Sequence, residues 1–394
     1  MKKKNLFFAF AALIAVSSCT SEINEEGFVD KANSISFNAY SNKSRAVSGD
    51  VTSDNMKNDN FGVVGYTGNN IYLYKKETIE SNTVYKAVEQ KWVPSGESGS
   101  WEYADLSDLR FWPNNKMDFY AYFPYTDKAT FAQSNASGNV MTIPNVNCSH
   151  DVLFAYAGGQ SKQERVPLTF HHAFAKIKGL NISMPAEGML NKSGCQIEVK
   201  GVEFINTSTS GTINVDNAGV ASYSGVSTTN PLAFTVDPVV TVNKAATSGS
   251  LIDNGTNAKG YFFATNNDAV NSVKGTAKTM WNGNKNSITG EGAKLSTSGL
   301  VCLKLTCKVW NGTSHYYVGS ATAEDYGVIY IPLTGNSSDP NSVATFDAGK
   351  RYTYTIRMKD NVGFTDEGDP ILTPILFNVT SVDEWGDVTV TITL

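Results

Sequence analysis

Five cysteines and four histidines are the residues of this sequence best suited to bind a metal or act as nucleophiles. None of the cysteines has the spacing of a zinc site. His171 and His172 are adjacent, so on a strand their side chains lie on opposite faces and cannot chelate one metal together. The motifs of serine hydrolases, nucleotide-binding loops and zinc proteases do not occur in the sequence. We therefore expect no enzyme, no cofactor and no metal site, and satisfied or solvent-facing histidines.

Two features leave room for a carbohydrate-related function. Carboxylate pairs for glycoside hydrolysis are set by distance in the fold, so sequence spacing does not exclude them. The aromatic segment at residues 119–125 (FYAYFPY) could stack against sugar rings. Its alternation of residues is also typical of a strand packed in a sandwich core, and the core interpretation is favoured.

Cys19 ends a leader that begins with three lysines, continues with about eleven apolar residues at 6–16 and closes with Ser17 and Ser18. The apolar stretch is too short for a membrane-spanning helix, which needs roughly 20 residues. The pattern is typical of a secretory signal over residues 1–18. It resembles the lipobox of bacterial lipoproteins, in which the cysteine is lipidated and becomes the first mature residue. A plain secretory signal with an incidental cysteine is the alternative.

Composition favours extracellular β-structure. Charged residues make up only 18% of the chain, and glycine, tyrosine and phenylalanine are abundant. The net charge of −5 is spread without basic blocks, which argues against nucleic-acid binding. Four further cysteines, at positions 148, 195, 302 and 307, are expected to be buried free thiols rather than disulfides.

The apolar residues alternate with period two almost throughout, and this predicts an all-β protein. About 375 residues follow the leader, which favours two domains, and the polar segment 184–194 is the expected boundary. The fold class is two consecutive β-sandwiches of transthyretin or immunoglobulin type. A change of apolar parity at Gly179 predicts a β-bulge there. Expected strands are 34–40, 61–66, 71–75, 83–92, 117–123, 152–156, 166–170, 173–182, 196–205, 211–215, 232–236, 260–265, 300–310, 315–319, 328–333, 351–358, 371–379 and 385–394.

Several segments in a fixed order resemble the fimbrillin family, the Mfa-like subunits of type V pili. Each is weak alone, but their ordered combination behind a lipobox is specific. The matching pieces are Cys19, residues 61–65 (FGVVG), 112–124 (WPNNKMDFYAYFP), 151–155 (DVLFA), 166–176 (VPLTFHHAFAK), 348–354 (AGKRYTY) and Trp385.

The resemblance implies a role for the N-terminal region. Family members are exported as lipoproteins whose first strand completes the N-terminal sandwich, until a trypsin-like protease cuts after an arginine and releases that strand. Here the expected first strand alternates Ile35, Phe37 and Ala39, and Arg45 and Ala46 follow in a polar segment. The division is then a propeptide at 19–45, an N-terminal sandwich at 46–184 and a C-terminal sandwich at 185–394. The alternative for Arg45 is an ordinary surface residue.

The resemblance also implies that a C-terminal strand of the neighbouring subunit fills the vacated groove. The chain ends with an alternating pattern that fits such a donor, with Val388, Val390, Ile392 and Leu394 on one face. Head-to-tail donation does not close on itself and produces a filament. The alternative is an ordinary last strand of the second sandwich.

These observations predict a fimbrial subunit, held in the outer membrane by a palmitate-bearing lipid anchor and later part of the extracellular fimbrium. Its expected partners are other subunits, a trypsin-like protease, and a host or glycan receptor for adhesion. The sequence also leaves two alternatives: a non-polymerising surface lipoprotein that binds glycan or host protein, and an outer-surface glycan hydrolase.

Overall fold

The structure is a computed structural model of the chain, and almost all of its regular elements are β-strands. Two short 3-10 turns are present, η2 (Asn55–Asn58) and η3 (Leu106–Asp108), and the described residues contain no α-helix, so the all-β expectation is confirmed. The structure describes residues 33–41, 51–96, 98–184, 193–205, 207–227, 229, 231–252, 260–263, 302–310, 312, 316–332, 346–357, 376–380 and 387–393.

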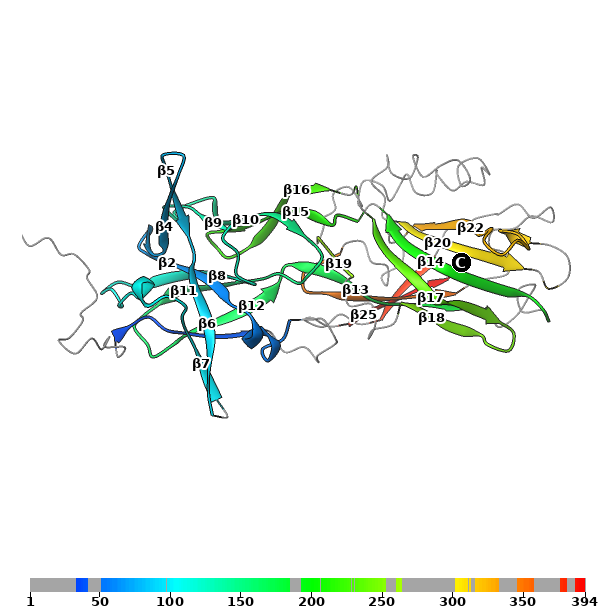
Figure 1. Ribbon diagram of the computed structural model, residues 1–394, viewed down its shortest axis with the longest axis horizontal. Helices are drawn as coiled ribbons and strands as arrows, with labels where there is room; N and C mark the ends of the chain where they lie inside the picture. The colour runs from blue at the N-terminus through cyan, green and yellow to red at the C-terminus, as the bar shows by residue number, and fades with distance from the viewer. Residues whose placement is uncertain are drawn as a thin grey trace, which may run out of the picture.

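The first sheet has eight strands and forms most of the N-terminal sandwich (Figure 1). Its order is β1-β12-β11-β8-β2-β6-β7, with β3 paired to β2. The sheet curls around one apolar core, because strands from both of its ends contribute side chains to that core and β1 contacts β7. The strands are β1 (Phe37–Ser41), β2 (Phe61–Thr67), β3 (Asn70–Leu73), β6 (Val88–Ser95), β7 (Ser98–Tyr103), β8 (Met117–Phe123), β11 (Leu153–Gln160) and β12 (Val166–His172).

The second sheet covers the outer face of the first across another apolar core. Its order is β16-β15-β10-β9-β5-β4. The central strand β8 therefore has both faces buried, with Phe119 in the inner core and Tyr120 in the core between the sheets. The strands are β4 (Lys75–Ile79), β5 (Asn82–Lys86), β9 (Thr130–Phe131), β10 (Asn139–Asn147), β15 (Ser210–Asp216) and β16 (Ala221–Ser227).

The C-terminal sandwich, at the other end of the long axis in Figure 1, consists of the third and fourth sheets around a single core. The third sheet has the order β18-β13-β23-β25-β24, with β19 paired to β13, and the fourth has the order β17-β14-β20-β21, with β22 paired to β20. The strands of the third sheet are β13 (Phe174–Ser183), β18 (Ser248–Ile252), β19 (Tyr261–Phe263), β23 (Arg351–Arg357), β24 (Leu376–Thr380) and β25 (Asp387–Thr393). Those of the fourth are β14 (Gln196–Ile205), β17 (Leu232–Asn243), β20 (Cys302–Trp310), β21 (Tyr316–Val318) and β22 (Gly327–Pro332).

Strand pairing crosses the boundary expected between residues 184 and 185. The β15–β16 hairpin follows β14 of the C-terminal sandwich but returns to pair with β10 in the N-terminal one. Conversely, β13 precedes the boundary and lies in the third sheet. A single cut in the sequence therefore does not separate the two sandwiches.

One nearly continuous strand, β12 followed by β13, links the two sandwiches. Strands β1 and β23 both run parallel to it. In β12 and β13, the even-numbered residues point their backbone groups to one edge. Val166 N–H donates to the Ser36 carbonyl just before β1, and Lys176 N–H donates to the Lys350 carbonyl just before β23, so β1 and β23 lie on the same edge. Along this edge, β1 ends opposite Phe170 and β23 begins opposite Lys176.

The bulge expected at Gly179 is confirmed. The register between β13 and β23 shifts between Ile177 and Gly179, so side chains on both sides of the shift, Ile177 and Leu180, enter the same core. Strand β10 was not among the expected strands, and it contains Pro144, a residue that is disfavoured in a strand interior. Its pairing with β15 shifts between Ile143 and Val146, so the proline lies within a bulge.

Candidate functional site

The site residues expected from the sequence fall at the two ends of the chain. Cys19, Arg45, Ala46 and Leu394 lie outside the described residues. Val388, Val390 and Ile392 lie in β25, whose backbone is described. The strand expected before Arg45 is present as β1, at one edge of the first sheet.

Strand β1 has a backbone ladder on one side only, and isolated hydrogen bonds hold its outer side and the residues just before it. On one side it forms a parallel ladder with β12, in which Phe37 is opposite Val166 and Ser41 is opposite Phe170. On the other side, Ile35 N–H donates to the Arg110 carbonyl at 2.9 Å, and Asn33 accepts from Trp112 N–H at 3.3 Å. At the far end of this outer side, Ser41 hydrogen-bonds to the Ser53 hydroxyl.

The side chains of the first strand fill the inner core of the N-terminal sandwich. Ile35 and Phe37 are completely buried, and Ala39 is partly buried. The Phe37 ring makes edge contacts with Phe119 and Phe61, at centroid distances of 5.4 and 6.4 Å. Burial of a side chain of this size contributes roughly 1.5–3 kcal/mol. The first strand is therefore an integral part of this core although it lies at the sheet edge.

Replacing Phe37 with alanine is expected to destabilise the N-terminal sandwich by about 3–5 kcal/mol, because it removes a buried ring and its aromatic contacts. Denaturant unfolding of the uncleaved subunit measures this change. The neighbouring exposed residue provides the matched control, since Asn38→Ala should change stability by no more than about 0.5 kcal/mol. Equal effects for the two variants would contradict the assigned orientation of the strand.

The C-terminal strand β25 lies in the interior of the third sheet. It pairs in parallel with β23 along its whole length, from Asp387 opposite Arg351 to Thr393 opposite Arg357. On its other side it pairs antiparallel with β24. Its relation to β23 is thus the same parallel one that β1 has to β12.

The aromatic segment after Lys116 is core, as expected. Residues Phe119 to Phe123 are all at most 5% exposed. The Tyr120 hydroxyl donates to the Asn217 carbonyl, and the Tyr122 hydroxyl donates to the Thr126 carbonyl. Burial is the main reason that the pKa of both hydroxyls is raised above the usual value. These rings offer no exposed platform for sugar stacking.

The adjacent histidines face opposite sides, as predicted. His171 is exposed, whereas His172 is buried with its Nδ1 2.6 Å from Asp151 Oδ2. The same carboxylate oxygen accepts a hydrogen bond from Val51 N–H at 3.3 Å. The Asp151 carboxylate therefore connects His172, at the end of β12, with Val51. Sequence reasoning did not identify this role, which depends on contacts between distant residues.

The described thiols lie in the interior of the protein. Cys148, Cys195 and Cys307 are buried thiols, which confirms the expectation for these three. Burial raises the pKa of the Cys307 thiol to about 12, and it also raises that of Cys148. Because the thiolate is the reactive form, neither group is suited to nucleophilic chemistry near neutral pH.

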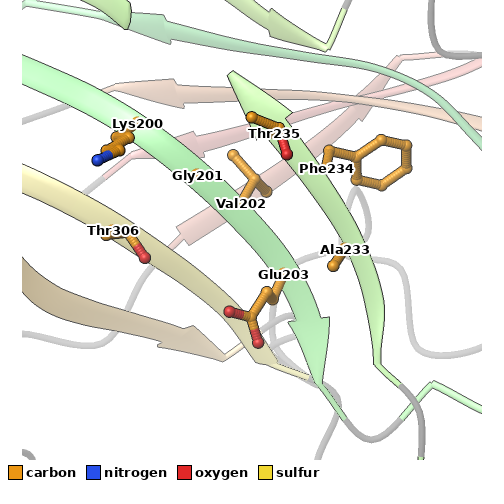
Figure 2. Close-up of a pocket in the computed structure, with 8 residues that line it drawn as sticks. All are labelled: Lys200, Gly201, Val202, Glu203, Ala233, Phe234, Thr235 and Thr306. Carbon is orange, nitrogen blue, oxygen red and sulfur yellow. The ribbon is translucent and has the colours of Figure 1, made fainter. Parts of the chain in front are cut away.

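A shallow depression of about 320 Å³ lies on the fourth sheet, and Figure 2 shows the residues that line it. It lies beside a bulge at Lys200, which has no register partner in either β17 or β20. Gly201 has no side chain to fill the depression. A Cβ atom at this position would lie nearest to the side chain of Thr306. Charged groups at its margin are paired: Lys304 with Glu203 at 2.8 Å, and Lys200 with Glu324. In these two ion pairs, the charge of each lysine is compensated by a glutamate.

Within the described ranges, no cluster of three or more histidine, cysteine or acidic residues could hold a metal ion. In the same part of the chain, no helix has the length and apolar character needed to cross a membrane.

The model of the Fimbrillin-like family, Mfa_like_1, matches residues 44–369. The chain belongs to the fimbrillin-like family. Proteins of this family are fimbrial and cell-adhesion proteins of the cell surface, structural rather than enzymatic. No match is found among curated proteins.

Three solved structures are similar to this fimbrillin-like chain. A fimbrial protein from Bacteroides vulgatus shares 16% identity, with 90% of this chain and 99% of that chain covered and a TM-score of 0.49. A fimbrilin from Porphyromonas gingivalis shares 14% identity, with 92% and 97% covered and a TM-score of 0.34. The tip fimbrial protein Mfa3 of the same organism, truncated at its C-terminus, shares 9% identity, with 85% and 93% covered and a TM-score of 0.30.

Proposed function

We propose that this fimbrillin-like protein is the precursor of a fimbrial subunit that polymerises by protease-triggered strand exchange and supports adhesion. Before processing, a lipid on Cys19 anchors it in the outer membrane. A trypsin-like protease then hydrolyses the bond between Arg45 and Ala46. The subunit thereby loses its first strand and joins the extracellular fimbrium, where it meets other subunits and a host or glycan receptor.

The observation that carries this proposal is the position of β1. It is an edge strand, so it can leave without breaking a ladder on two sides, yet its apolar side chains are core residues. Arg45 follows four residues after the end of β1 at Ser41. Cleavage there leaves the strand on the short fragment and the rest of the sandwich on the long one.

Departure of β1 leaves a site that another strand can fill. The outer edge of β12 at residues 166–170 loses its backbone partners, and the rings of Phe61 and Phe119 lose the side chain of Phe37. Unpaired backbone groups beside exposed apolar surface are a template for strand addition. A strand with alternating apolar residues would restore both the ladder and the core.

The proposed donor is β25, with Val388, Val390 and Ile392, extended by Leu394. This strand already forms a parallel ladder with β23. Donation exchanges the intramolecular ladders with β23 and β24 for one with β12 of a neighbour. Since each subunit accepts at one end and donates with the other, the contact is head-to-tail and builds a filament.

The direct test is to treat the purified, de-lipidated precursor with an arginine-specific protease and to separate the products on a non-denaturing gel. The proposal expects a ladder of oligomers that appears only after cleavage after Arg45, with the cut confirmed by mass spectrometry. A cleaved subunit that remains monomeric at high concentration would refute strand exchange.

Replacing Cys19 with serine is expected to abolish lipidation, because the thiol is the acylation point proposed from the sequence pattern. Several acyl chains, at about 0.8 kcal/mol per buried CH₂, would otherwise hold the precursor on the membrane. Metabolic labelling with a radioactive fatty acid measures the loss. Cys148→Ser is a matched control that should retain the label, and label in the Cys19 variant would exclude the lipobox interpretation.

A further inference from the structure

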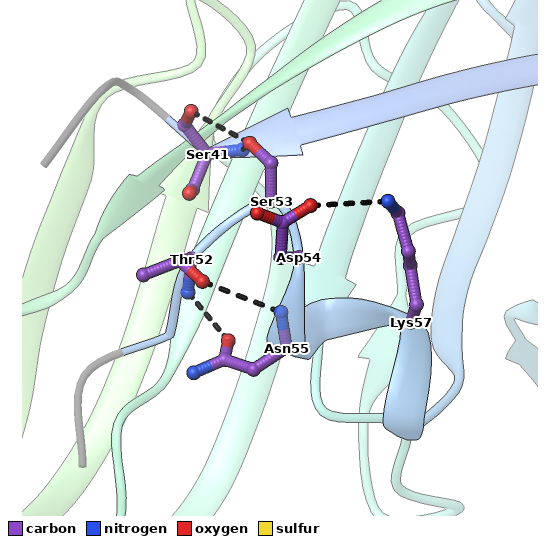
Figure 3. Close-up of polar contacts among 6 residues, drawn as sticks. All are labelled: Ser41, Thr52, Ser53, Asp54, Asn55 and Lys57. Atoms are coloured by element: carbon purple, nitrogen blue, oxygen red, sulfur yellow. Dashed lines mark hydrogen bonds and ion pairs between the residues drawn. The ribbon is translucent and has the colours of Figure 1, made fainter. Parts of the chain in front are cut away.

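The outer side of the first strand is held at both ends. Near its start, Asn33 and Ile35 hydrogen-bond to residues 110–112. At its end, Ser41 N–H donates to Ser53 Oγ at 3.1 Å, and the same hydroxyl donates to the Ser41 carbonyl at 3.2 Å. One side chain therefore satisfies both main-chain polar groups of the last residue of β1 (Figure 3).

The direction of these bonds follows from the geometry of a strand. Backbone groups of alternate residues point to alternate sides, and Ser36 uses its carbonyl to accept from β12. Residues of odd number, including Ser41, therefore point away from β12. Ser41 is 6% exposed, so its polar groups would be poorly solvated without the Ser53 hydroxyl.

Ser53 is rigidly placed. Thr52 N–H donates to Asn55 Oδ1 at 2.5 Å, Asn55 N–H donates to Thr52 Oγ1 at 3.3 Å, and Met56 N–H donates to the Thr52 carbonyl at 2.9 Å. Figure 3 shows the reciprocal pair beside Ser53. Met56 is completely buried in the same core as Phe37. The Ser53 hydroxyl therefore belongs to a turn whose own hydrogen bonds do not involve β1.

Ser41 and Ser53 lie on opposite sides of the cleavage point, so their contact survives hydrolysis of the chain. We infer that Ser53 is a latch that keeps β1 seated after cleavage and sets the rate at which the strand leaves. This inference rests on the proposed function, because it concerns the step between cleavage and strand exchange. A subunit that is cut but still latched keeps its apolar groove covered until a donor strand competes for it.

The first experiment tests the latch without cleavage. Amide hydrogen exchange resolved to Ser41 is measured in the intact subunit for the parent and for Ser53→Ala. Loss of the hydrogen bond should accelerate exchange at Ser41 about tenfold. Ser53→Thr keeps the hydroxyl and should exchange at the parent rate. Asp54→Ala is the matched control, because it breaks only the neighbouring exposed pair with Lys57. Equal exchange in the parent and Ser53→Ala would overturn the latch.

The second experiment measures release. After cleavage after Arg45 by an arginine-specific protease, dissociation of the short fragment is followed by size-exclusion chromatography with mass detection. Ser53→Ala should release it about tenfold faster than the parent, Ser53→Thr and Asp54→Ala. Identical release rates would overturn the inference. A failure to cut after Arg45 would instead contradict the proposed function, while the exchange experiment still decides whether Ser53 holds Ser41.

Discussion

Replacing Arg45 with alanine is expected to leave the subunit full-length and monomeric after treatment with an arginine-specific protease. The cut is removed, β1 stays paired with β12, and the groove does not open. The protected subunit should also unfold at a higher temperature than the cleaved and released form. It retains Ile35 and Phe37 in the core, each contributing roughly 1.5–3 kcal/mol, which corresponds to a shift of several degrees in Tm.

The matched control is Lys43→Ala, which changes a basic residue two positions before Arg45 and leaves the arginine site intact. This variant should be cut and should assemble like the parent. An arginine-specific enzyme is preferable to trypsin itself, because cleavage after Lys43 would also free β1. Oligomers formed as efficiently by Arg45→Ala as by the parent would show that cleavage at this residue is not the trigger.

Deleting residues 388–394 is expected to abolish self-assembly of the cleaved subunit while its N-terminal sandwich stays folded. The deletion removes the alternating apolar face of Val388, Val390 and Ile392 that is proposed to enter the groove of a neighbour. The truncated subunit can still accept a strand. Added to full-length cleaved subunits, it should therefore shorten the polymers in proportion to its concentration.

Circular dichroism and size-exclusion chromatography of the truncated, cleaved subunit distinguish the alternatives. Because β25 lies between β23 and β24, its deletion could instead unfold the C-terminal sandwich and cause aggregation. That outcome would identify β25 as a structural strand and not as a donor. A folded polymer would place the donor elsewhere. Thr391→Ser, which preserves the apolar alternation and chain length, is the control and should assemble normally.

Much of the local structure follows from the sequence. Strand β8 occurs where its alternation predicts it, at Met117–Phe123, and Gly179 lies in the expected bulge. The first strand, with Ile35 and Phe37 directed inward, was also expected. Alternation reports side-chain direction along a single strand, which is a local property of the backbone. The same property explains why His171 and His172 face opposite sides.

The tertiary structure decided which strands meet. Nothing in the sequence of the β15–β16 hairpin indicates that it pairs with β10. Nor does the sequence of β8 indicate that the second sheet covers its outer face and buries Tyr120. The contact of Ser41 with Ser53 likewise has no local signal, since a serine in a polar segment is common in any loop. Many strands of this protein have a similar apolar alternation, so strand pairing depends on which combination of strands buries the apolar side chains of all three cores. By itself, the sequence determined most of the strands and their inward faces, whereas partners, sheet edges and the anchoring of β1 depend on contacts between residues distant in the chain.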